Sequence, residues 1–337
     1  MKYRLLGNSG LRVSEISLGT MTFGTEWGWG GDKEESKKMF DAYANAGGNF
    51  LDTANLYTNG TSEKFVGEFI KSDRDHFVLG TKYSLFDREG DLSFAGNNRK
   101  NLMRSVEGSL KRLQTDYIDL LWLHAWDDMV PNEEVMRGVD DLVSSGKVRY
   151  IGISDTPAWV VSRANTIAEL RGWSQFVALQ IEYSLIQRTP ERDLTPMAKS
   201  RGLAVTPLAP LAGGALTGIY IRGEEGRVKE DSLRRNVRST TITQKVVEVA
   251  EKLDASPAQV ALRWTMQQEF TSIPIVGGRK VSQMEDSLGS ADLVIPDELM
   301  AELNAVSEIE LGFPHDFLQQ DTVKNVLFAG QKDKIIR

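Results

Sequence analysis

Short apolar segments recur along the chain, and longer polar or amphipathic stretches separate them. Eight of these segments are rich in Val, Ile, Leu and Phe, and most are too apolar to expose one face to water. They therefore fit strands that are covered on both faces. The predicted strands lie in SEISLGT near residue 14, GNFLDTA near 48, HFVLGTK near 76, YIDLLWLH near 117, VRYIGIS near 148, FVALQIE near 176, LAVTPLAP near 203 and TSIPIVGG near 271.

Helical patterns lie between the predicted strands. Two apolar stripes repeat every three or four residues and predict amphipathic helices: Leu102, Val106, Leu110 and Leu113, and Val135, Val139 and Leu142. Ser256, which precedes Pro257, and Ser282, which precedes Glu285 by three residues, predict capped helix starts. Gly47 and Gly48 predict the end of the first helix.

Strands that alternate with helices indicate a parallel sheet, and eight is the number of strands that closes a (β/α)8 barrel. A doubly wound open sheet is the competing α/β architecture. It would normally carry a GxGxxG turn after its first strand, whereas this chain has LGTMTFG there. We therefore predict one α/β domain over residues 1–337, a (β/α)8 TIM barrel.

Three segments fall outside the simple repeat. Residues 1–13 resemble a hairpin with a turn at Gly7 to Gly10, which could close the bottom of the barrel. Residues 211–240 form a long, charged connection, and loops of that length are usually functional or disordered. Residues 309–337 form a separate C-terminal segment.

Composition and charge exclude several classes of function. The net charge of -7 speaks against nucleic acid as a partner, because phosphate binding needs a basic surface. The chain has no cysteine, so a disulfide framework, a thiol nucleophile and a Cys-ligated metal are excluded. It has three histidines, too few for a typical metallohydrolase site, and we predict no metal. Without a signal peptide or an apolar span, we expect a soluble, cytoplasmic protein that has no membrane partner.

Four ionisable residues follow three consecutive predicted strands. Asp52 ends the second strand and Tyr57 lies in its loop, while Lys82 ends the third strand and His124 the fourth. Each alone has an ordinary structural explanation, as a turn cap, a solvated tip or a rim histidine. Together they gather at the C-terminal face of the barrel, where the chemistry of such barrels takes place.

These four side chains suit protonation of a carbonyl oxygen. A tyrosine has a pKa of about 10, and a nearby ammonium lowers it. We expect Lys82 to lower the pKa of Tyr57, Asp52 to keep Lys82 charged, and a neutral His124 to donate a hydrogen bond to the carbonyl oxygen. No side chain is a source of hydride, so a cofactor would have to supply it.

The motifs DTANLY, LGTK and LLWLH resemble the catalytic motifs of the aldo-keto reductase superfamily, and the resemblance extends along nearly the whole chain. It implies that Asp52, Tyr57, Lys82 and His124 are the catalytic residues. It also implies NADPH (NADP⁺) as the cofactor and a small carbonyl compound as the substrate, which would be reduced to an alcohol.

Further motifs resemble the cofactor site of that family and imply a set of NADPH-binding residues. Gly19, Thr20 and Met21 follow the first barrel strand. The residues implied around the nicotinamide are Ser154 and Asp155 in GISD, Gln180 in LQIEYSL, and Leu208 in PLAPL. Those implied along the pyrophosphate are Leu211, Gly213 and Gly214, in the 211–240 loop, which the resemblance implies covers the cofactor at the C-terminal face. Those implied at the adenosine 2′-phosphate are Gly277, Arg279, Gln283 and Asp286.

Elementary chemistry supports the last of these groups independently. A glycine pair after the eighth strand leads into a helix that we expect Ser282 to cap, so backbone N–H groups can receive phosphate. Arg279 adds a planar donor fork suited to a phosphate. Leu208, Asp155, Ile219 and Ser287 depart from residues common in the family and leave the preference for NADPH over NADH open.

Aromatic residues predict a wide, apolar substrate pocket. Trp27 and Trp29 lie in the loop after the first strand, Phe86 follows Lys82, and Trp126 follows His124. The resemblance also implies that the C-terminal segment, with Phe313 and Phe317, folds over the mouth. We expect about half of these aromatics to pack loops onto the barrel instead. The rest would favour aromatic or bulky carbonyl compounds over short keto acids.

Two other functions stay open at this point. One is a regulatory cofactor-binding subunit, because the resemblance also reaches the β subunits of potassium channels. The other is a Schiff-base aldolase with Lys82 as nucleophile, although Asp52 should keep that lysine protonated. The physiological substrate, the direction of turnover and the oligomeric state are not determined by these patterns.

Overall fold

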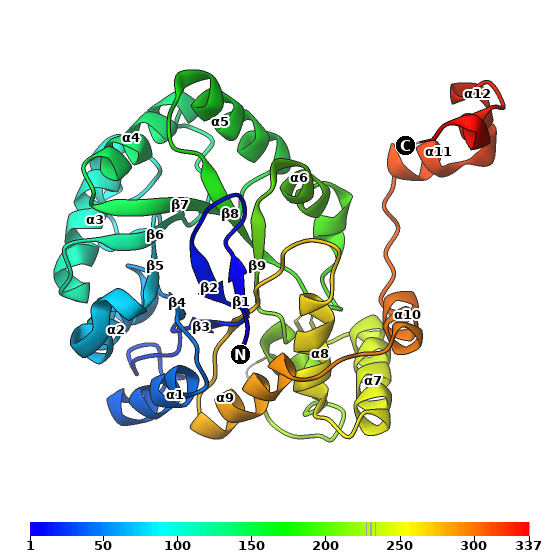
Figure 1. Ribbon diagram of the computed structural model, residues 1–337. Coiled ribbons are helices and arrows are strands. Elements are labelled where there is room, and N and C mark those ends of the chain that lie inside the picture. The colour runs from blue at the N-terminus through cyan, green and yellow to red at the C-terminus, as the bar shows by residue number, and fades with distance from the viewer. Residues whose placement is uncertain (227, 230, 233, 337) are drawn as a thin grey trace.

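The barrel wall consists of eight parallel strands in the part of the chain that the computed structural model describes, residues 1–226, 228–229, 231–232 and 234–336 (Figure 1). The strands are β3 (Ser17–Gly19), β4 (Phe50–Asp52), β5 (Val78–Tyr83), β6 (Ile118–Leu123), β7 (Val148–Ser154), β8 (Phe176–Glu182), β9 (Ala204–Leu208) and β10 (Ile275–Val276). They pair in the order β10-β3-β4-β5-β6-β7-β8-β9. A parallel bridge between Val205 and Ser272 closes the ring. The predicted (β/α)8 barrel is confirmed.

Helices surround this wall (Figure 1). They are α1 (Lys33–Asn45), α2 (Thr61–Ile70), α3 (Arg99–Leu113), α4 (Asn132–Ser144), α5 (Ala158–Arg171), α6 (Leu194–Arg201), α7 (Val237–Lys252), α8 (Pro257–Met266), α9 (Val281–Leu288) and α10 (Asp297–Val306). Shorter 3-10 turns connect them: η1 (Tyr57–Gly60), η2 (Lys71–His76), η3 (Leu92–Phe94), η4 (Thr189–Arg192), η5 (Ala212–Thr217) and η6 (Gly289–Ala291). Both predicted apolar stripes are buried, on α3 and α4.

The predicted helix starts have different outcomes. Ser256 caps α8 through a reciprocal pair of hydrogen bonds with Gln259, as predicted. The expectation that Ser282 caps α9 is wrong, because the helix begins at Val281 and Lys280 precedes it without a side-chain cap. The Val281 N–H donates instead to Glu35 Oε1 of α1, at a distance of 2.7 Å. A partner on another helix thus satisfies one of the free N–H groups at the start of α9.

The N-terminal hairpin closes the bottom of the barrel, as predicted (Figure 1). Its strands are β1 (Tyr3–Leu5) and β2 (Arg12–Ser14), which pair antiparallel. Two of its side chains, Leu6 and Val13, are fully buried. They form one apolar cluster with residues at the lower ends of the barrel strands, among them Phe50, Val78, Ala204 and Ile273.

The C-terminal segment does not cover the barrel mouth. Two short helices, α11 (His315–Gln319) and α12 (Asp321–Leu327), and the turn η7 (Lys332–Lys334) stand clear of the barrel (Figure 1). Phe313 is 84% exposed, so its predicted place in the substrate pocket is wrong for this structure. The reason is an anchor at the root of the segment, where Arg192 donates to the Glu310 carbonyl and the chain then leads outward. No described helix is long and apolar enough to cross a lipid bilayer.

We expect Gly7→Ala to destabilise the protein by roughly 1–3 kcal/mol. Gly7 has a φ of +59°, and a Cβ there would lie 2.1 Å from the Val177 carbonyl oxygen, so the hairpin would have to lift from the barrel. Gly10→Ala is the matched control, because a Cβ at Gly10 meets nothing within 4 Å. Urea unfolding measures the stability of both variants, and equal losses of stability would contradict the packing of the hairpin against the barrel bottom.

Candidate active site

The four predicted catalytic residues meet at the C-terminal face of the barrel. Asp52 ends β4, Lys82 lies near the end of β5, and His124 directly follows β6. Lys82 Nζ donates to Asp52 Oδ2 at 2.5 Å and to the Thr53 carbonyl at 2.8 Å. The same Nζ lies 4.7 Å from the centre of the Tyr57 ring. The rings of Tyr57 and His124 stand edge to face, with centres 5.9 Å apart.

Lys82 is held as an ammonium ion. The side chain is completely buried, and burial alone would lower the pKa of Lys82. The charge of Asp52 and the interaction with Tyr57 outweigh burial, so the pKa is raised. An amine in this state is not the free nucleophile that a Schiff base needs.

Tyr57 is a neutral phenol in this environment. Burial raises its pKa, and the charge of Lys82 offsets only part of that rise. The expected net lowering is therefore wrong for this structure, because loss of hydration outweighs the ammonium. The phenol keeps its proton at neutral pH, which is the state that a proton donor requires.

His124 is neutral, as predicted. Burial and, to a smaller extent, the charge of Lys82 lower the pKa of His124 to about 3. Its Nδ1 is buried without a hydrogen-bond partner among the described residues. A neutral imidazole carries one donor and one acceptor and can bind a carbonyl oxygen without adding a charge.

The loop after Tyr57 has an unusual backbone. Thr58 and Asn59 have φ of 45° and 55°, and Gly60 also has a positive φ. A β-branched residue such as Thr58 is rare in this region and needs support from its surroundings. Thr58 Oγ1 donates to the Phe23 carbonyl at 2.6 Å and accepts from the Ser62 N–H at 3.1 Å. Sequence patterns missed this support, because Phe23 lies 35 residues before Thr58, in another loop.

The loop after β3 packs against the Tyr57 loop. The rings of Trp27 and Tyr57 meet edge to face, with centres 6.3 Å apart. Trp27 Nε1 donates to Asn59 Oδ1 at 3.4 Å, and Trp29 lies against Trp27. One of the predicted substrate aromatics therefore borders the candidate proton donor, and a second packs behind it.

The other predicted substrate aromatics have mixed positions. Phe86 is partly exposed in the loop after β5. Trp126 packs on the main core. Its backbone N–H donates to the Asp155 carbonyl, so this residue also links the loop after β6 to the segment after β7. Phe313 lies in the segment that stands away from the barrel.

The residues implied around the nicotinamide differ in their hydrogen bonds. Ser154 Oγ, at the end of β7, is buried without a partner among the described residues. Gln180 Nε2 donates to Asp52 Oδ1 at 3.0 Å, so it links this region to the catalytic residues. Asp155 has a φ of +40°, which Asp and Asn tolerate better than most residues, and its side chain is exposed. An unsatisfied hydroxyl beside an amide fits a carboxamide ligand.

The loop implied along the pyrophosphate is tied back to the barrel. Leu208 ends β9 and is partly exposed, and Leu211 precedes η5. Gly213 and Gly214 both have positive φ. Arg234 donates twice to Glu182 Oε1 at the end of β8, at 2.7 and 3.0 Å. Residues 227, 230 and 233 of the predicted 211–240 loop, and residue 337 of the C-terminal segment, lie outside the described residues.

The residues implied at the 2′-phosphate lie around the start of α9. Arg279 is exposed, and its backbone N–H donates to Gln283 Oε1 at 2.8 Å. Gly277 is also exposed. Asp286 has a structural role as well, because Ser256 and Gln259 of the neighbouring helix donate to its carboxylate.

The first predicted cofactor segment lies beside Gly277. A Cβ on Gly277 would come within 2.9 Å of the Gly19 carbonyl oxygen, so the two strands approach closely there. Thr20 Oγ1 contacts the Asp52 carbonyl and Ser62, and Met21 is partly exposed. Thr20 therefore supports the backbone under the site.

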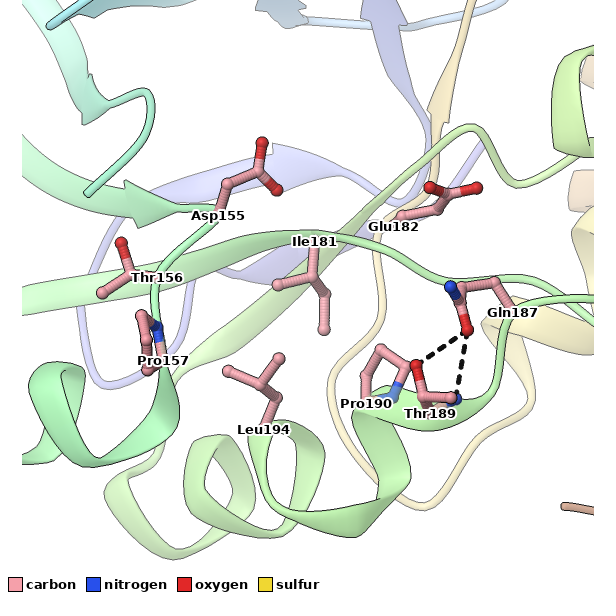
Figure 2. Close-up of a pocket in the computed structure, with 9 residues that line it drawn as sticks. All are labelled: Asp155, Thr156, Pro157, Ile181, Glu182, Gln187, Thr189, Pro190 and Leu194. Carbon is pink, nitrogen blue, oxygen red and sulfur yellow. Dashed lines mark hydrogen bonds between the residues drawn. The ribbon is translucent and has the colours of Figure 1, made fainter. Parts of the chain in front are cut away.

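A cavity of about 280 Å³ lies at the rim, between the segments that follow β7 and β8 (Figure 2). It was not predicted from the sequence, because its walls come from separate loops. Its lining is Asp155, Thr156, Pro157, Ile181, Glu182, Gln187, Thr189, Pro190 and Leu194. The described part of the chain has no group of three or more His, Cys, Asp or Glu side chains that could hold a metal ion.

We expect His124 to make the protein less stable as the pH falls. Above pH 6.5, His124 is neutral in both the folded and unfolded chain. Between about pH 6.5 and 3 the unfolded chain binds a proton there and the folded chain does not, so stability falls. His124→Gln should reduce this slope by up to about 1.4 kcal/mol per pH unit in urea unfolding. His315→Gln, on the C-terminal segment, is the control, and identical slopes for the parent and His124→Gln would refute the depressed pKa.

Comparison with known proteins agrees with this geometry. Residues 15–308 match the model of the "Aldo/keto reductase family". The aryl-alcohol dehydrogenase [NADP(+)] of Phanerodontia chrysosporium is 39% identical, with 98% of this chain and 92% of that protein covered. Norsolorinic acid reductase of Aspergillus flavus is 36% identical, covering 94% and 84%, and norsolorinic acid reductase B of Dothistroma septosporum is 38% identical, covering 98% and 87%. The chain with this barrel and this group of four side chains belongs to the aldo/keto reductase family.

Proposed function

We propose that the protein reduces aldehydes or ketones to alcohols, with NADPH as the hydride source and Tyr57 as the proton donor. The observation that carries this proposal is a neutral Tyr57 bordered by the Lys82 ammonium and the neutral His124. The bound cofactor would supply a hydride to the carbonyl carbon. The protein's own residues handle the proton and the developing negative charge on oxygen.

Each of the four residues has a distinct task. Tyr57 gives its proton to the carbonyl oxygen as the carbon–oxygen bond is reduced. Lys82 stabilises the phenolate that remains, because its ammonium lies beside the ring. Asp52 keeps Lys82 charged and in place through their hydrogen bond. His124 orients the carbonyl by a hydrogen bond and adds no charge.

The cofactor site is proposed from the free polar groups around the mouth. Ser154 and Gln180 would bind the carboxamide, and the backbone at Gly213 and Gly214 would follow the pyrophosphate. Arg279 and the N-terminus of the eight-residue helix α9 would bind the 2′-phosphate. A relative named for NADP(+) supports this choice of cofactor.

The raised pKa of Lys82 argues against the aldolase alternative, and the complete set of four catalytic side chains argues against a purely regulatory role. For the substrate we propose aromatic or bulky apolar carbonyl compounds. Trp27 borders Tyr57 and Trp29 packs on Trp27, and the names of the relatives refer to aryl alcohols and norsolorinic acid.

Tyr57→Phe should reduce carbonyl reduction by at least 10²–10⁴-fold, as expected for the loss of a general acid. The ring and its packing remain, so NADPH binding measured by fluorescence should stay near that of the parent. Tyr117→Phe is the control, because its hydroxyl bonds Asp75 at the opposite end of the barrel. A Tyr57→Phe enzyme that keeps the parent rate would remove Tyr57 from the reaction.

Arg279→Ala should weaken NADPH binding and leave NADH binding nearly unchanged, because only NADPH carries the 2′-phosphate. Titration of both cofactors measures the difference. Arg137→Ala, an exposed arginine of α4, controls for the general loss of a positive charge. Equal losses for NADPH and NADH in Arg279→Ala would place the 2′-phosphate elsewhere.

A nitrobenzaldehyde should be reduced with a higher kcat/KM than pyruvate under matched NADPH. An apolar pocket gains roughly 1–3 kcal/mol from one good apolar contact and offers little to a carboxylate. Absorbance of NADPH reports both rates. Faster reduction of pyruvate would refute the aromatic substrate class while leaving the role of Tyr57 intact.

A further inference from the structure

We propose that residues 307–336 are an exchange arm, in which α11 and α12 pack onto the catalytic face of a second copy of this chain. The second copy places its own arm on the first, so the contact is reciprocal. The proposal concerns assembly and rests on geometry outside the four catalytic residues.

The root of the arm, residues 304–310, is fixed to the barrel, and the chain leads outward from there. Arg188 donates to the Asn304 carbonyl and to Ser307 Oγ, each at 2.9 Å. Arg238 donates to the Ser307 carbonyl at 2.8 Å. Arg192 holds the Glu310 carbonyl at 2.8 Å. These three arginines tie down the last turn of α10 and the first residues of the arm, so the projection in Figure 1 starts from a rigid base.

Beyond this root the arm buries little of its apolar surface. The helices α11 and α12 have five and seven residues, which is too short to be stable without a packing surface. They pack against each other and stand clear of their own barrel (Figure 1). The large apolar side chains of the arm that are between 47% and 96% exposed are Phe313, Phe317, Leu318, Val326, Leu327, Ile335 and Ile336.

The exposed area is large enough for a specific interface. One aromatic side chain can bury about 150–250 Å², so these seven side chains offer on the order of 600–800 Å². A typical monomer exposes a largest apolar patch of about 300–600 Å². Two exchanged arms alone would bury on the order of 1,200–1,600 Å², which already reaches the 1,200–2,000 Å² of a stable complex.

Charge argues against a membrane surface as the partner of the arm. Residues 307–336 contain five acidic and three basic side chains. A segment that binds an anionic membrane surface would need an excess of basic residues.

The receiving surface lies at the rim of the catalytic face. Outside the arm, four exposed apolar side chains follow the neighbouring strands β5, β6 and β7: Phe86, Leu92, Met129 and Trp159. Because the strands are adjacent and parallel, the segments that follow them meet at one edge of the mouth. An arm docked there would bring Phe313 of the second copy to the mouth that its own barrel leaves open.

The first experiment measures mass. Light scattering after size exclusion should give twice the 37.5 kDa of one chain for the parent and one chain mass for a chain ending at residue 308. The double variant Val326→Ser, Leu327→Ser should weaken the dimer at least tenfold in Kd. The double variant Leu170→Ser, Val294→Ser changes exposed apolar residues outside the arm and should stay dimeric. A monomeric parent, or a dimer that survives loss of the arm, overturns the proposal.

The second experiment identifies the receiving surface and uses the absence of cysteine in the chain. One copy carries Gln319→Cys on α11, and another carries Asp128→Cys beside Met129. After mixing, a short bis-maleimide should join the two copies into one covalent dimer. A chain that carries both substitutions and crosslinks only within itself, at protein concentrations where the parent is dimeric, shows that the arm folds onto its own barrel and overturns exchange. Neither readout depends on enzymatic activity, so failure of the arm proposal leaves the proposed reductase function untouched.

Discussion

The buried ion pair between Lys82 and Asp52 is the constraint on which the rest of the site depends. Removing two charges from water costs several kcal/mol each, and the pair is tolerated only when further hydrogen bonds satisfy both partners. Here the Thr53 carbonyl accepts from Lys82, and Gln180 donates to Asp52 from the opposite side of the barrel. The barrel strands must therefore keep their register, because β4, β5 and β8 each contribute one partner.

Burial sets the protonation states of the neighbouring residues, and the ion pair modifies them. Burial and, to a smaller extent, the ammonium lower the pKa of His124, whereas burial keeps the Tyr57 proton in place against the effect of the ammonium. Two contacts from the loop after β3 then hold Tyr57 beside this charge: the Phe23 carbonyl accepts from Thr58, and Trp27 packs on the tyrosine ring. The strained backbone at Thr58 is thus stabilised by the same loop that packs on Tyr57.

Local signals were sufficient for the strands, the hairpin and the grouping of Asp52, Tyr57, Lys82 and His124. Each depends on residues close in sequence and on the rule that parallel strands end at one face. The cap of α9 could not be predicted, because Glu35, which binds the Val281 N–H, lies 246 residues earlier. The pKa of Tyr57 required the amount of burial, which no spacing reveals. The position of Phe313 depended on Arg192, an anchor in a different loop.

The N-terminal hairpin has a consequence for how the chain folds during synthesis. Leu6, among the first residues made, is buried in a cluster that includes Ala204 and Ile273. Most of the barrel is therefore synthesised before the complete surface against which the hairpin packs exists. Until then Leu6 and Val13 remain without their native neighbours, and the barrel bottom stays open to water. Contacts this distant in sequence slow folding, because a long loop must close before they form. Final closure of the barrel bottom thus joins the first part of the chain to nearly the last.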